Sequence, residues 1–319
     1  MADQDFPGNM PDGGEAFEKA RAAYHEARSR GALLDLDRAQ WRLTGADRVR
    51  YLNGQVTNDI RRATPDAAIP ACVTTSKGKL CGLIFVSALP DALRIDAESD
   101  LREPLTARLD RYIIADDVVL HDVTPEWSLL HLITAQKPVP LPGAEIRAAT
   151  RYGRPGWDIV APCAEKARLI AALTGSHTLL DGHPAESLRI EAGAPRWGAE
   201  LTEETLPPEA RLDLTAIDYH KGCYIGQEVI SRIKSVGHVN RMLTGFTAAA
   251  SLAPGFTIHP VSDPGQPAGY ITSAVWSFGL ETWAALGYLK RAFAAAPLHA
   301  RAPDGATIPI QSRDLPLVP

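Results

Sequence analysis

A cysteine stands between a lysine and the predicted start of a helix in the segment Lys221-Gly222-Cys223-Tyr224-Ile225-Gly226-Gln227-Glu228. A thiol beside a cation, or at a helix N-terminus where unpaired backbone N–H groups carry partial positive charge, has a pKa below the value of about 8.5 of a free cysteine. Glycines on either side of the thiol allow the backbone to turn sharply. The segment therefore predicts that Cys223 is displayed as a reactive thiol, with Lys221 favouring its thiolate.

The residues after this motif predict the helix that positions it. Val229, Ile230 and Ile233 recur at helical spacing, and Gly237 stands where such a helix would end. His220 lies three residues before the cysteine, and we leave two interpretations open for it, a base for the thiol or an exposed side chain.

The motif K-G-C-Y-x-G-Q-E resembles the folate-binding YgfZ family, whose members are related to the glycine-cleavage aminomethyltransferase. The resemblance extends over most of the chain from about Leu33. The segments that carry it besides the motif are Gly45–Asp59, Ile190–Gly193, Trp197–Leu201, Leu206–Ala210 and Val239–Arg241.

The resemblance implies an α+β fold with two ferredoxin-like folate-binding units, the second inserted into or interleaved with the first, and a C-terminal β-barrel that completes a ring. The expected organisation is a disordered tail and an N-terminal helix over 1–31, the folate-binding region over 32–235, and the barrel over 236–319. The sequence pattern agrees with this layout. Strand and helix patterns alternate up to the motif, and short strand-like runs separated by Pro and Gly follow Gly237.

The family implies that tetrahydrofolate, or another reduced folate, is the ligand. A carboxylate can accept the paired N–H donors of a pterin edge, as it accepts those of arginine. The segment around Glu191 resembles the pterin-reading segment of the aminomethyltransferases, although a solvated glutamate is the alternative. Trp197 is a candidate aromatic wall or a structural residue, and Arg241 and Lys221 are candidates for the anionic glutamyl tail or solvated cations.

One departure from the aminomethyltransferases bears on the reaction. Those enzymes resemble Thr75–Ile84 but carry a pair of aspartates where this chain has Cys81 and Gly82. Neither residue supplies a carboxylate for proton transfer at the folate nitrogen. Aminomethyl transfer is therefore the weaker expectation.

The resemblance implies a tetrahydrofolate-binding accessory protein that assembles or repairs iron–sulfur clusters in client enzymes, with Cys223 as the reactive thiol. The alternative is a folate-dependent one-carbon transferase of the aminomethyl type. A third hypothesis is a folate-sensing scaffold in which the cysteine only packs.

Composition sets broad limits on these functions. The 319 residues are 45% hydrophobic and 22% charged, and a net charge of -5 does not favour nucleic-acid binding. The four cysteines, Cys72, Cys81, Cys163 and Cys223, form no short pair of the kind that binds zinc or an iron–sulfur cluster, so no metal site is expected. No apolar run reaches the roughly 20 residues that span a bilayer. We expect a cytoplasmic monomer.

Overall fold

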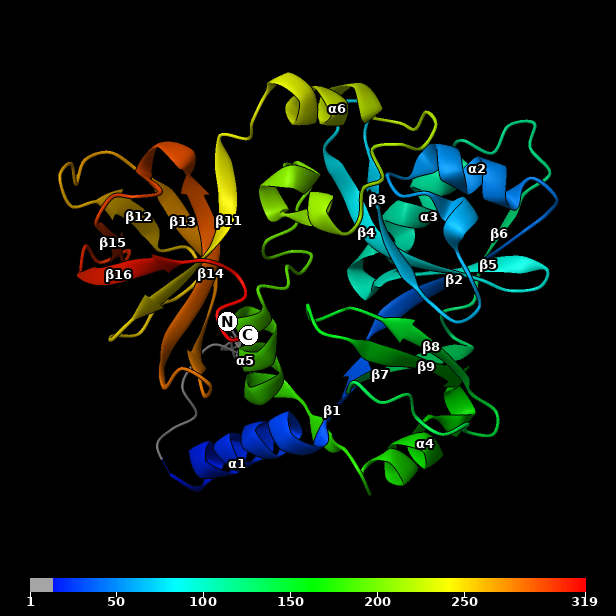
Figure 1. Cartoon of the computed structure of the whole chain (residues 1–319), viewed down its shortest axis with the longest axis horizontal. Coiled ribbons are helices and arrows are strands. Elements are labelled where there is room, and N and C mark those ends of the chain that lie inside the picture. Colours follow the sequence, from blue (N-terminus) through cyan, green and yellow to red (C-terminus); the bar gives the residue numbers. More distant parts are fainter. Residues whose placement is uncertain (1–13) are drawn as a thin grey trace.

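The computed structural model describes residues 14–319, so the predicted tail lies almost wholly outside the described residues. Helix α1 (Glu15–Arg30) begins the description and ends at Gly31, as the sequence predicts. Two five-stranded sheets and a closed barrel follow. Figure 1 shows them arranged as a ring, with the barrel on one side, the sheets on the other, and helices α5 and α6 between them.

The first sheet, with the strand order β10-β1-β7-β9-β8, joins distant parts of the chain. Strand β1 pairs parallel with β10 and antiparallel with β7. Its alternating side chains reach both faces, because Leu33 packs among the residues under α4, whereas Leu34 packs with Tyr24 of α1. The elements of this region are β1 (Ala32–Leu36), β7 (Trp127–Ile133), β8 (Glu145–Ala149), β9 (Gly156–Pro162), η3 (Cys163–Glu165), α4 (Lys166–Leu173), β10 (Thr178–Leu180) and α5 (Gly182–Ala192).

The second sheet, with the order β3-β4-β5-β2-β6, is built from one continuous stretch inserted between β1 and β7. Its core surrounds Trp41, Leu52 and Leu105, all of them fully buried. Its elements are β2 (Arg38–Thr44), α2 (Arg48–Gln55), η1 (Ile60–Arg62), β3 (Ile69–Thr74), β4 (Leu80–Ala88), β5 (Ala92–Glu98), η2 (Ser99–Leu101), α3 (Arg102–Asp110) and β6 (Val119–Asp122). The strands of one sheet thus lie, in sequence, within the stretch that forms the other.

The barrel closes through pairing of β11 with β16. Its core includes Phe246, Ile258 and Leu289. Its strands are β11 (Arg241–Ala248), β12 (Thr257–Pro260), β13 (Gly269–Ser277), β14 (Thr282–Lys290), β15 (Leu298–Arg301) and β16 (Thr307–Arg313), with η6 (Arg291–Phe293) between β14 and β15. The α+β class with a C-terminal barrel is confirmed.

The ring is held together by α5, by short 3-10 turns and by the last residues of the sequence. Ile190 of α5 packs with Leu243 and Val275 of the barrel. The backbone N–H of Leu317 donates to the carbonyl of Glu191 at 2.6 Å, so residues after β16 lie across α5. Helix α6 (Gln227–Val236) bridges the second sheet and the barrel, after the turns η4 (Pro207–Ala210) and η5 (Leu212–Leu214). Within residues 14–319, no helix combines the length and apolarity that a membrane span requires.

Candidate functional site

The ammonium of Lys221 is buried in the protein. Its Nζ donates to the backbone carbonyls of Asn53, Val56 and Asn58 at 2.6 to 2.7 Å, and the side chain is only 5% exposed. Burial lowers the pKa of Lys221 to about 8. The lysine therefore ties the motif to the end of α2, and all three of its donors are used for that contact.

Cys223, two residues later, is exposed. The chain then turns sharply at Gly226, whose φ of 89° lies in the left-handed region, and α6 begins at Gln227. A Cβ at Gly226 would come within 2.6 Å of the Thr75 carbonyl, so only glycine fits at this position. The displayed thiol and the helix start agree with the sequence interpretation.

The other three cysteines differ in their solvent exposure. Cys72 is fully buried, which raises its pKa to about 12, and burial also raises the pKa of Cys81. Cys163 is exposed in the η3 turn. Strand β9 ends at Pro162, and the next residue is already outside the sheet.

The Glu191 carboxylate lies inside a closed network between α5, α1 and the barrel. It accepts from Tyr24 Oη at 2.5 Å, from Ser187 Oγ at 2.8 Å, from Ser277 Oγ at 2.6 Å and from the Gly279 N–H at 3.2 Å. The residue is 1% exposed and is not among those that line the central cavity described below. The structure therefore uses this carboxylate to dock α1 and the β13–β14 turn onto α5.

Trp197 and Arg241 also make internal contacts. Trp197 packs against the core of the second sheet. Arg241 pairs with Glu209 at 3.0 Å, donates to Tyr270 Oη at 2.8 Å, and lies 4.7 Å from the centre of the Tyr288 ring. The structure does not bring Glu191, Trp197, Arg241 and Cys223 together in one pocket.

A cavity of about 430 Å³ lies at the centre of the ring. It is bounded by β2, β4 and β5 of the second sheet, by the β8–β9 loop, by the segment after α5, by η4 and η5, and by Leu315 and Pro316. Phe85 and Tyr152 contribute aromatic rings to its wall. Its volume and mixed lining are those of a small-molecule site.

Two polar groups in this cavity have hydrogen-bonding capacity left. Glu98 stands directly opposite Arg38 across the β2–β5 pair. One Glu98 oxygen accepts from the Trp197 N–H at 3.1 Å, and burial raises the pKa of this carboxyl. Arg38 Nε donates to Asp96 at 2.8 Å, while its buried Nη2 has no partner among residues 14–319. The cavity thus offers a second carboxylate oxygen on Glu98, whereas the unpartnered Arg38 N–H is enclosed by the protein.

The sequence interpretation missed Glu98 and Arg38. A signal was present, because Arg94, Asp96 and Glu98 alternate with apolar residues along one strand and so point to one face. The pairing partner of that strand, which brings Arg38 beside Glu98, was not predictable from the local pattern.

Gly82 contacts helix α3. A Cβ at this position would lie 2.9 Å from Leu101 Cδ1 and 3.1 Å from Leu105 Cδ1. Cys81 also packs against the core on this side, whereas Leu83 and Phe85 of the same strand line the central cavity. This part of the cavity wall is therefore apolar, and the packed helix leaves no room for an aspartate at Gly82.

No protein-family model matches the chain. Two curated relatives, both named tRNA-modifying protein YgfZ, come from Escherichia coli O157:H7 and Yersinia pestis (strain Pestoides F). The first is 30% identical over 242 residues, which cover 70% of this chain and 73% of the relative. The chain belongs to the YgfZ family. The second is 28% identical over 261 residues, covering 75% of this chain and 78% of the relative.

A solved structure supports the fold of this YgfZ-family protein. The glycine cleavage system aminomethyltransferase T from Bartonella henselae superimposes with a TM-score of 0.81, covering 94% of this chain and 89% of its own. At 17% identity, the likeness shows a shared fold. Within residues 14–319, no group of three or more His, Cys, Asp or Glu side chains is placed to hold a metal ion.

Proposed function

We propose that this YgfZ-family protein binds a reduced folate in the central cavity and supports the assembly or repair of iron–sulfur clusters in client enzymes. The observation that carries the folate proposal is the cavity carboxylate of Glu98. A pterin edge presents N–H donors, and the Glu98 oxygen that does not bond Trp197 is an acceptor for them. Glu98 thereby takes the role that the sequence analysis gave to Glu191.

The aromatic rings support the same ligand. Phe85 and Tyr152 line the cavity, and Arg151, which is buried and paired with Asp96 and Asp158, lies 4.1 Å from the centre of the Phe85 ring. These contacts fix the aromatic wall before a ligand arrives. A flat heteroaromatic ring would gain stacking or edge contact there without rearrangement.

Calorimetry with 5-formyltetrahydrofolate tests the folate proposal. We expect saturable binding, and an increase in the melting temperature that grows with ligand concentration, since a ligand that binds only the native state stabilises it by mass action. Absence of heat with the reduced folates, at protein concentrations that detect a Kd of 100 μM, would remove this proposal. That threshold is roughly 5.5 kcal/mol of binding free energy.

The second part of the proposal is that Cys223 is the group that meets the client protein. Its exposure supports this role, and the Lys221 contacts hold the loop that presents it. In cells that lack the protein, wild type should restore the activity of an iron–sulfur enzyme and Cys223→Ala should not. Cys163→Ala, at the other exposed cysteine, is the matched control. Full rescue by Cys223→Ala would remove the thiol from the mechanism.

The relatives' name suggests one class of client. A client that modifies tRNA through an iron–sulfur cluster would join that name to the proposed role, and no direct RNA contact by this chain is then required. The overall charge of -5 is consistent with an indirect role.

The alternative, aminomethyl-type transfer, has less support. The strand that faces the folate in the proposal presents Leu83 and Phe85 to the cavity, and Gly82 lies against α3. No carboxylate on this strand can handle a proton at the folate nitrogen. Production of methylenetetrahydrofolate with the other glycine-cleavage components, at about 1 per second or faster, would reverse this ranking.

A further inference from the structure

Two buried arginines, Arg94 on β5 and Arg147 on β8, come from different sheets and meet beside Ser87 of β4. Arg94 stands directly opposite Ser87 in the β4–β5 pair, so the two side chains share one face of the second sheet. A guanidinium N–H of Arg147 donates to Ser87 Oγ from the first sheet. Arg94 is 2% exposed and Arg147 is 3% exposed. Two positive charges are therefore enclosed next to each other between the sheets.

Four nitrogen atoms of these two side chains are buried and have no hydrogen-bond partner among residues 14–319. They are Nε and Nη1 of Arg94 and Nε and Nη2 of Arg147. Nearly all buried polar groups in proteins have a partner, and a guanidinium group can only donate. Unmet donors on two adjacent cations therefore point to a negatively charged acceptor.

The carboxylates near this arginine pair do not balance its charge. Arg94 pairs with Glu145 at 3.0 Å. Arg147 has no carboxylate within 4.0 Å in the part of the chain that the structure describes. Burial lowers the pKa of Arg147, and the charge of Arg94 acts in the same direction, against the more distant Asp158 and Asp96. One positive charge is thus left without a direct partner.

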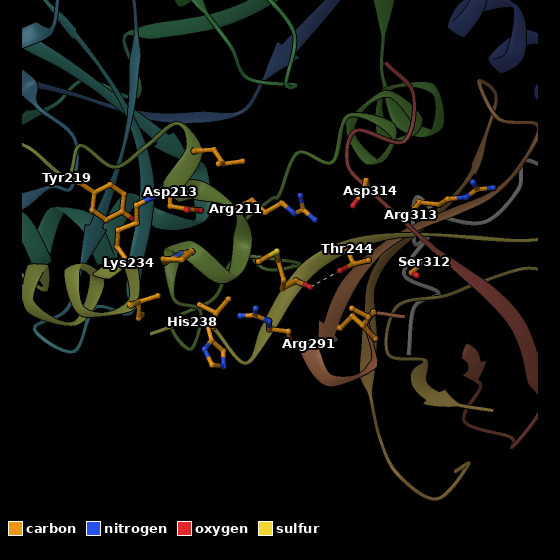
Figure 2. A pocket seen from close by; sticks show the side chains of 17 residues that line it. Arg211, Asp213, Tyr219, Lys234, His238, Thr244, Arg291, Ser312, Arg313 and Asp314 are labelled. Atoms are coloured by element: carbon orange, nitrogen blue, oxygen red, sulfur yellow. Dashed lines mark hydrogen bonds between the residues drawn. The ribbon is translucent and has the colours of Figure 1, made fainter. Parts of the chain in front are cut away.

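The cations of the hollow between α6, η5 and the barrel are in a different setting. Figure 2 shows Arg291 and Arg313 in this hollow, and both are exposed, so water can hydrate their charges. Bulk water does not reach Arg94 and Arg147 in this way. Because a buried charge is strongly destabilising unless it is paired and hydrogen-bonded, only the enclosed pair requires a partner.

We propose that Arg94 and Arg147 bind one small monovalent anion, chloride in the cell, which joins β5 of the second sheet to β8 of the first. The anion accepts from both guanidinium groups and offsets the repulsion between them. A single negative charge balances the unpaired Arg147, whereas a divalent oxyanion such as phosphate would place excess negative charge beside Glu145. Neither arginine lines the central cavity, so this site is separate from the proposed folate site.

Thermal unfolding tests this site when sodium gluconate is replaced stepwise by sodium chloride up to about 0.5 M, which keeps the ionic strength and therefore the screening constant. Gluconate is too large for an enclosed site. We expect the melting temperature to rise with the logarithm of the chloride concentration, by at least about 3 °C, because chloride binds only the native state. The rise should be lost in Arg147→Met. It should remain in the control Arg111→Met, which removes an exposed cation after α3.

Bromide locates the anion in the wild-type protein, so this measurement does not depend on how a variant folds. In crystals soaked in sodium bromide, we expect an anomalous X-ray peak between the two guanidinium groups, bonded to nitrogens of both. Ordered water there in place of bromide would overturn the inference. An equal rise in melting temperature in Arg147→Met would also overturn it, as would a bromide peak without any chloride dependence in solution, which would show binding at crystal concentration only. Each of these outcomes leaves the proposed folate function standing.

Discussion

Within residues 14–319, one oxygen of the cavity residue Glu98 and the buried Arg38 Nη2 have no hydrogen-bond partner, whereas in the motif loop the Lys221 ammonium already has three acceptors and Cys223 is exposed. The cavity has the unmet hydrogen bonds of a binding site. The loop has the satisfied contacts of a support that displays an exposed thiol. A polar residue in a family motif can therefore serve the fold, while polar groups with unmet hydrogen bonds lie outside the motif.

Removal of the Lys221 ammonium should have the largest effect on stability, because it removes the buried support of the motif loop. Lys221→Met keeps most of the volume but leaves three buried carbonyls without a donor, and we expect the free energy of unfolding to fall by about 3 kcal/mol or more. Urea titration measures this change. The exposed Lys234→Met is the control and should stay within about 0.5 kcal/mol. Normal stability with lost rescue in cells would instead give Lys221 a chemical role.

The two glutamates should respond differently to loss of charge. Glu98→Gln keeps an acceptor for the Trp197 N–H, and we expect it to weaken reduced-folate binding by about 1 to 3 kcal/mol with little change in stability. Glu191→Gln should lower stability by a similar amount, because its four donors lose a charged acceptor, and should leave the Kd unchanged. The reverse result would return the pterin contact to Glu191. Calorimetry and urea unfolding of both variants decide between these outcomes.

Folate binding should also depend on pH through Glu98. Because burial raises its pKa, the free protein keeps the proton at pH values above the usual glutamate value of about 4.3. The proton must leave before the carboxylate can accept from the pterin, so affinity should fall as pH falls through this raised pKa. Calorimetry from pH 8 to pH 5 measures the slope. In Glu98→Gln that slope should be absent, and a slope that persists there would assign the dependence to another group.

The smallest change in stability is expected from substitution of Cys223. Since the side chain is exposed, Cys223→Ala should change stability by no more than about 0.5 kcal/mol. In native alkylation followed by mass spectrometry, Cys223 and Cys163 should label, and the buried Cys72 should not. Labelling of Cys223 faster than of Cys163 would show activation beyond exposure, as the sequence interpretation predicts. Equal rates would show that exposure alone explains its reactivity.

The local sequence pattern was sufficient to predict the elements around the motif. The Gly226 turn, helix α6 and the main barrel strands follow from glycine positions and apolar periodicity over a few residues.

The cavity could not be predicted in this way, because it is formed by contacts between residues that are far apart in the sequence. Arg38 meets Glu98 only through the register of β2 and β5. The Glu191 carboxylate accepts hydrogen bonds from Tyr24, 167 residues away in sequence, and from Ser277 on the barrel. The periodicity of a single sequence contains no information about either of these long-range contacts. The motifs therefore indicated the family without showing which residues line the cavity.

The insertion of the second sheet between β1 and β7 has a consequence for the nascent chain. Residues 38–122 of this sheet are contiguous and can pair as soon as they leave the ribosome, whereas β1 finds its parallel partner only when β10 at Thr178–Leu180 has been made. At translation rates of about 5 to 20 residues per second, the interval between the synthesis of β1 and the synthesis of β10 lasts roughly 10 to 30 s. During it, the apolar strand Ala32–Leu36 is incompletely paired and is a candidate chaperone-binding segment. Slow translation before β10 would prolong this exposure, so synonymous codons upstream of Thr178 could influence the yield of folded protein.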